Sequence, residues 1–135
     1  MSEPVATVSV DLAGVLAAFH VAQLRCILVT GDARDTPAPP HRILLPRDPD
    51  QRERLARVLA GWLPGLAIEL PRSPSPTDHW TFGTRSGPVT LVWEVAGAGD
   101  HAAVAPHTRP MRVGDTTVLR LALIDLVAGP PRARE

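Results

Sequence analysis

Residues 41–62 read HRILLPRDPDQRERLARVLAGW, and this stretch decides the fold. The run 41–45 predicts a short strand, because its apolar residues lie together. Asp48 followed by Pro49 is typical of a helix start, with the aspartate as N-cap and the proline in the first helical position. Apolar side chains then recur at positions 55, 58, 59 and 62, which share one face of a helix. The unit therefore predicts a strand followed by an amphipathic helix.

The flanking segments extend this pattern in both directions. Upstream, Asp11 is expected to cap a helix with an apolar face at 12, 15, 16 and 19, and the run 24–29 is expected to form a strand that ends at a glycine turn. Downstream, we expect extended segments at 66–70, 80–85, 89–95, 109–113 and 116–119, one helical turn within 97–106 and a closing helix at 121–128. Helices and strands alternate early and strands cluster late. The predicted class is α/β (α+β), with a mixed β-sheet flanked by helices.

Composition limits the classes of protein that the chain can belong to. Its 135 residues are expected to form one domain at 1–129 and a short tail at 130–135. Fourteen acidic side chains balance fourteen cationic ones, all arginine, which argues against a nucleic-acid partner. The single Cys26 excludes an internal disulfide and a cysteine-based zinc site. No apolar run approaches the ~18–20 residues of a membrane span, and the first residues lack the features of a signal peptide. We therefore expect a cytoplasmic protein with no membrane partner.

The order of these elements resembles the small bacterial nucleotidyltransferase-like domains over roughly residues 9–129. The first helix, strand and glycine turn of that family correspond to residues 10–33, VDLAGVLAAFHVAQLRCILVTGDA. Its second strand and helix correspond to HRILLPRDPDQRERLARVLA at 41–60, its hairpin to TFGTRSGPVTLVWE at 81–94, and its closing stretch to TTVLRLALIDLVAG at 116–129. The resemblance implies a single nucleotidyltransferase-like domain.

The positions that carry the chemistry of that family hold other residues here. The resemblance implies a two-glycine turn that approaches nucleotide phosphates, and this chain has Thr30 and Gly31 there. It implies two metal-binding carboxylates on the second strand, where this chain has His41 and Ile43, and a third in the hairpin, where it has Thr90. Mg²⁺ prefers hard oxygen ligands, and isoleucine and threonine cannot replace two carboxylates. We therefore expect no metal site.

Four acidic residues are candidates for catalysis if the chain is active. Asp48 and Asp50 form an Asp-x-Asp pair, which fits either displaced metal carboxylates or a helix cap followed by an acid in the first turn. The proline between them favours the helix start. Asp32 follows the glycine turn and is either a ligand contact or a turn residue. Glu94 lies four residues after Thr90 and shares its face if the strand continues, but one carboxylate makes a poor two-metal site.

Two further side chains, His41 and Cys26, are candidates for a functional role. His41 stands where the family has its first aspartate, so it is either a ligand contact, a lone metal ligand or a structural histidine. Cys26 alternates with Ile27 in the strand predicted at 24–29, which favours a buried, unreactive thiol over a nucleophile.

We expect a catalytically degenerate nucleotidyltransferase-like protein that acts as a non-enzymatic binding, accessory or regulatory module. The expected partner is another protein or a second copy of the chain, and no cofactor is expected. The alternative is a divergent, active nucleotidyltransferase that transfers a nucleotide to a small molecule, an RNA or a protein. Only this alternative requires Mg²⁺. The sequence leaves a nucleotide as a possible ligand in both cases.

Overall fold

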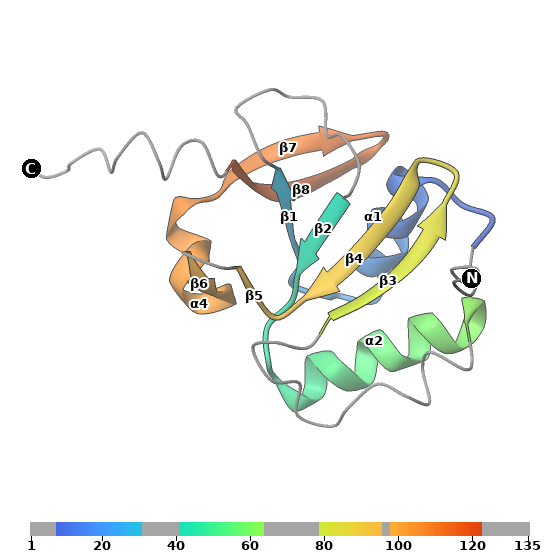
Figure 1. Ribbon diagram of the computed structural model, residues 1–135, viewed down its shortest axis with the longest axis horizontal. Helices are drawn as coiled ribbons and strands as arrows, with labels where there is room; N and C mark the ends of the chain where they lie inside the picture. The colour runs from blue at the N-terminus through green and yellow to red at the C-terminus, as the bar shows by residue number, and fades with distance from the viewer. Residues whose placement is uncertain (1–7, 31–40, 64–78, 96–97, 123–135) are drawn as a thin grey trace, which may run out of the picture.

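The computed structural model describes residues 8–30, 41–63, 79–95 and 98–122. These residues form a six-stranded sheet in the order β3-β4-β2-β1-β8-β7 (Figure 1). Strands β2 and β4 pair in parallel, as do β1 and β8, and the other neighbours are antiparallel. The strands are β1 (Ile27–Thr30), β2 (His41–Leu44), β3 (His79–Thr84), β4 (Gly87–Val92), β7 (Arg109–Val113) and β8 (Thr116–Ala122). The predicted mixed α/β class is confirmed.

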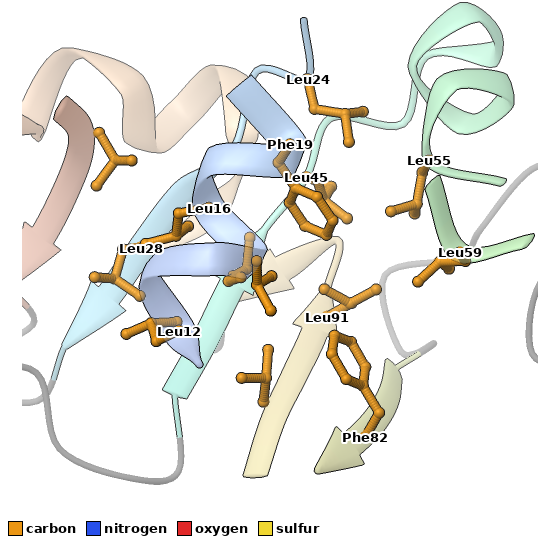
Figure 2. Packing of buried hydrophobic residues seen from close by; sticks show 14 of the residues in the cluster. Leu12, Leu16, Phe19, Leu24, Leu28, Leu45, Leu55, Leu59, Phe82 and Leu91 are labelled. Carbon is orange, nitrogen blue, oxygen red and sulfur yellow. The ribbon is translucent and has the colours of Figure 1, made fainter. Parts of the chain in front are cut away.

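Two helices, α1 (Leu12–Val21) and α2 (Pro49–Trp62), pack on one face of this sheet. The side chains at i, i+3, i+4 and i+7 of α1 are all buried, because that spacing places them along one side of the helix. Figure 2 shows Leu16 and Phe19 of this helix in the same core as side chains of α2 and the sheet. The labelled members of this core include Leu16 and Phe19 of α1, Leu55 and Leu59 of α2, and Phe82 and Leu91 of the β3–β4 hairpin.

A smaller apolar cluster lies on the other face of the sheet. It joins alternate residues of the central strands, Ile27, Val29, Leu44 and Leu121, to Val95 and Val104. The covering residues belong to the short ribbon β5 (Glu94–Val95) with β6 (Gly99–Asp100), to α4 (His101–Val104) and to the 3₁₀ turn η1 (Ala105–His107). Because side chains alternate along a strand, the central strands are buried on both faces.

The two long helices begin at capping aspartates, as the sequence predicts. The Asp11 carboxylate accepts a hydrogen bond from the Gly14 N–H at 2.9 Å, and the Asp48 carboxylate accepts one from Asp50 at 2.9 Å. Each satisfies a helix N–H that has no partner within the helix. Pro49 occupies the start of α2, where its missing N–H removes no helical bond.

Polar side chains of α2 hold the segment between α1 and β1. Gln51 is buried, its Oε1 accepts from the Arg25 N–H at 2.7 Å, and its Nε2 donates to the Gln23 carbonyl at 3.2 Å. Arg54 donates to the Ala22 carbonyl at 3.2 Å and to the Gln23 side chain at 2.9 Å. We call Gln51 and Arg54 the α2 clamp.

Three predicted boundaries differ from the structure. β1 begins at Ile27 instead of residue 24, because the N–H groups of Leu24 and Arg25 bond to the Phe19 carbonyl and to Gln51 instead of to a neighbouring strand. The hairpin strand β4 ends at Val92, and a bend at Trp93 separates it from β5. Leu121 and Ala122 belong to β8, so the helix predicted at 121–128 is wrong at its start. Residues 123–128 and the strand predicted at 66–70 lie outside the described residues.

Candidate functional site

Two of the predicted nucleotide-site positions meet at one end of the sheet. Thr30 ends β1 and His41 begins β2. Because these strands are antiparallel and Val29 pairs with Arg42, Thr30 and His41 lie just beyond that pair. Both side chains are buried. The Thr30 hydroxyl donates to the Leu121 carbonyl at 3.5 Å, and His41 Nε2 lies 3.1 Å from the Ser86 carbonyl. Each side chain therefore bonds to the backbone of a neighbouring segment.

Ile43 lies in the main core beneath the helices. Its side chain is fully buried, and it pairs with Leu28 of β1 and Leu91 of β4, which belong to the same core. An aspartate here would place a charge in a close-packed apolar environment without water. The packing of β2 therefore explains why isoleucine suits this position.

Thr90 lies on the opposite face of the sheet from Ile43. Its hydroxyl is 2.9 Å from that of Thr81 on β3, and its parallel partner on β2 is Arg42. Partners in register point to the same side of a sheet, so the β2 side chain beside Thr90 is a guanidinium. Ile43 and Thr90 therefore do not share a site.

Asp48 and Asp50 bind groups within and beside α2. Besides its capping bond, Asp48 pairs with Arg25 through Oδ2 and Nη2 at 2.9 Å. Asp50 pairs with Arg54 at 2.9 Å, one helical turn further along. The helix-start interpretation of this acidic pair agrees with both contacts. Exposed pairs of this kind contribute at most about 1 kcal/mol each.

Glu94 does not place a carboxylate near Thr90. Glu94 is exposed and lies on β5, opposite Asp100 of β6, because the bend after β4 ends the alternation that would place it beside Thr90. Asp32 and Gly31 lie outside the described residues. Among the residues that the structure describes, no three His, Cys, Asp or Glu side chains gather as a metal-binding group.

A cavity of ≈ 260 Å³ lies toward the other end of β1 and β8, where these parallel strands begin. Its walls are Leu16 and His20 of α1, residues 24–26, His101 of α4 and residues 117–119 of β8. The lining is largely apolar with a few polar groups, which is typical of a small-molecule site. The α2 clamp bonds to the chain at residues 22–25, so α2 also positions this wall.

Two titratable side chains in this lining have shifted pKa values. Burial raises the pKa of the Cys26 thiol from 9.0 to about 11, and a backbone hydrogen bond opposes this only in part. Burial also lowers the pKa of His101 from 6.5, and the charge of Arg25 acts in the same direction. A hydrogen bond with the Arg25 backbone and the charge of Asp100 oppose the shift of His101. Both side chains are therefore neutral near pH 7.

Local spacing could not reveal this cavity, because its lining comes from four separate segments of the chain. Cys26 is half-buried, and its raised pKa agrees with the expectation of an unreactive thiol, since the thiolate is the reactive form. His101 carried no distinguishing signal in the sequence. Only the packing of α4 against the start of β1 gives it a special environment.

Comparison with known proteins adds no relative. No protein-family model matches the chain, and no curated protein and no solved structure is significantly similar to it. Within the described ranges, no helix has the length and apolar character needed to cross a membrane.

Proposed function

We propose that this protein is a non-enzymatic binding module, built on a nucleotidyltransferase-like domain that lacks the metal chemistry. The observation that supports this proposal most directly is what β2 and β4 place at the three expected metal-binding positions. His41 bonds to backbone, Ile43 fills the core, and Thr90 pairs with another threonine.

Charge on the Thr90 face supports the same proposal. Phosphoryl and nucleotidyl transfer depend on divalent cations that neutralise the negative charge on the phosphates. Carboxylates hold such cations, whereas the guanidinium of Arg42 repels them. With Arg42 in register beside Thr90, this face favours an anion over a metal ion. No cofactor forms part of the proposal.

The proposed partner is another protein or a second copy of this chain. Among the described residues, two large apolar side chains are exposed, Val21 at 81% and Leu119 at 42%. Val21 adjoins a groove between the end of α1 and α2 that Ala22 and Val58 also line. Such surfaces are recurrent protein contacts. The accessory role and the cytoplasmic location are parts of the same proposal.

A nucleotide-transfer assay tests the enzymatic half of the proposal. The full chain is incubated with each of the four α-labelled nucleoside triphosphates and Mg²⁺ or Mn²⁺, and labelled products are separated. We expect no protein-dependent transfer. Transfer that disappears in Asp32→Ala or Glu94→Ala, while the matched Asp115→Ala control retains it, would establish the divergent enzyme instead.

The binding half is tested by the mass of the protein in solution. Light scattering after size exclusion should show self-association if a second copy is the partner, and Val21→Asp should weaken it without lowering thermal stability. Glu53→Gln, another exposed position on a helix of the same face, serves as control. A monomer at every concentration excludes the second copy and leaves a different protein as the partner.

A further inference from the structure

The groove between the end of α1 and the middle of α2 combines apolar surface with a cationic side. Ala22 and Val58 line it and are half-buried against the main core, whereas Val21 is 81% exposed. Apolar surface in contact with water is unfavourable, and its removal from water drives most protein association. The groove therefore offers apolar surface that a bound partner would cover.

Two arginines of α2, Arg54 and Arg57, form the cationic side of this groove, and none of its lining residues is acidic. Arg54 is already engaged, because Nε pairs with Asp50 at 2.9 Å and Nη1 bonds to the end of α1. Arg57 is exposed, and no acidic side chain among the described residues forms an ion pair with it. Its planar guanidinium is therefore available to both oxygens of a partner's carboxylate.

The charge of the groove distinguishes between candidate partners. A two-fold contact between copies places the same patch on both sides, so Arg57 of one copy would lie near the guanidinium groups of the other. Like charges that meet across an interface oppose association. A nucleic acid supplies anions but no aliphatic side chain to cover Val21, and the balanced charge of the chain does not favour it. An acidic segment of a different protein satisfies both the charge and the apolar surface.

The groove has a volume of ≈ 360 Å³, more than the ~150 Å³ of a protein cavity that binds benzene. One large apolar side chain therefore fits, with room for an adjoining carboxylate. We propose that this groove binds a short acidic segment of another protein, which places a large apolar side chain against Val21 and Val58 and a carboxylate on Arg57. The inference rests on the proposed binding function and names its partner by chemistry.

Peptide selection tests this groove without a known partner. A phage-displayed library of short random peptides is selected on the immobilised full-length protein, and peptides that also bind the Val21→Asp protein are removed. The remaining peptides should carry net negative charge and a large aliphatic or aromatic side chain. Recovery of basic or purely polar peptides, or no enrichment relative to the Val21→Asp protein, would overturn the proposal.

Charge-reversal variants then locate the binding site. The most strongly enriched peptide is synthesised with a fluorophore, and its affinity is measured by fluorescence anisotropy. Arg57→Glu should weaken binding about tenfold or more, because the peptide carboxylate loses a charged donor and meets a like charge. Arg109→Glu is the matched control, since it makes the same change of charge at an exposed arginine of β7 and should leave the affinity unchanged. Equal effects of the two variants would refute a site at Arg57.

Two further measurements separate this inference from the proposed function. Self-association that Val21→Asp abolishes would overturn the inference but leave the binding module intact, with a second copy as its partner. Nucleotide transfer in the labelled assay would overturn the proposed function, while the peptide affinities would still decide the groove. Binding of a fluorophore-labelled oligonucleotide that Arg57→Glu abolishes would overturn the inference, because it would assign the groove to a nucleic acid.

Discussion

Raising the pH above about 9 should destabilise this protein through one side chain, the thiol of Cys26. Burial holds its pKa at about 11 in the folded protein, against 9.0 in the unfolded chain. Lysine and tyrosine, whose ordinary pKa values are about 10.4 and 10, are absent from the sequence. No other side-chain type therefore has its ordinary pKa between 9 and 11. A change in the free energy of unfolding over this pH range therefore reports the ionisation of this thiol.

The direction of the effect follows from proton binding. Between pH 9 and about 11 the unfolded chain has lost the thiol proton and the folded chain retains it. The free energy of unfolding therefore falls as the pH rises through this interval. Two pKa units correspond to roughly 2–3 kcal/mol, and partial exposure of the residue makes this the upper end of the expected loss. Below about pH 9 the stabilisation is complete.

The matched variant is Cys26→Ala. Urea unfolding followed by far-ultraviolet circular dichroism is measured from about pH 8 to about pH 11, in the presence of a reductant. The variant loses some packing at every pH, so it should be less stable than the native protein near pH 8. Its stability should then change little, and the difference between the two proteins should shrink by roughly 2 kcal/mol.

Thiolate absorbance gives a second, direct measurement. Without tyrosine, no phenolate contributes to the ultraviolet spectrum in this pH range. Titration of the folded native protein should therefore show a single alkaline transition near pH 11, which Cys26→Ala lacks. Parallel stability curves for the two proteins, or a thiol that titrates near its ordinary pKa, would refute the inference that burial raises the pKa of Cys26.

Three further predictions concern packing and proton binding. Gln51→Ala should lower the free energy of unfolding by about 1–3 kcal/mol in urea titrations, because it leaves the Arg25 N–H without its acceptor; a change below about 0.5 kcal/mol would show that the α2 clamp adds nothing. Leu59→Ala should cost about 2–5 kcal/mol, since its fully buried side chain leaves a cavity, whereas the exposed Leu119→Ala should cost little. Below about pH 6.5 the unfolded chain protonates His101 before the folded one does, so acid should reduce stability, and His101→Gln should reduce that dependence in the same titrations.

Local patterns predicted the helices and their caps because the responsible contacts are local. Asp11 and Asp48 bond to residues two or three positions further on, and the apolar faces follow from the helical repeat. The start of β1 was not predictable in this way. Leu24 and Cys26 belong to the same apolar run as Ile27, but the N–H groups of Leu24 and Arg25 bond to α1 and α2 instead of to a strand, and nothing in that run signals it.

The α2 clamp also lay beyond prediction from the sequence. Gln51 lies four residues before Leu55, on the apolar side of α2, and the charge of Arg54 favours solvent, but neither property identifies a hydrogen-bond partner. Their partners are backbone groups near Gln23, almost thirty residues away, and these groups need partners because they follow the end of α1. A long-range hydrogen bond of this kind depends on how two helices pack, and the helical repeat does not encode it.

The functional interpretation depends on the register in which β2 pairs with β4. Alternation along β2 was predictable, but which of its residues share a face with Thr90 depends on how β2 pairs with β4. On the Thr90 face β2 presents Arg42 and Leu44, and on the helix face it presents His41 and Ile43. A shift of one residue exchanges these two sets, and neither contains a carboxylate. Nucleotidyl transfer by two metal ions would therefore require acids from outside these paired strands, whichever face is taken as the site.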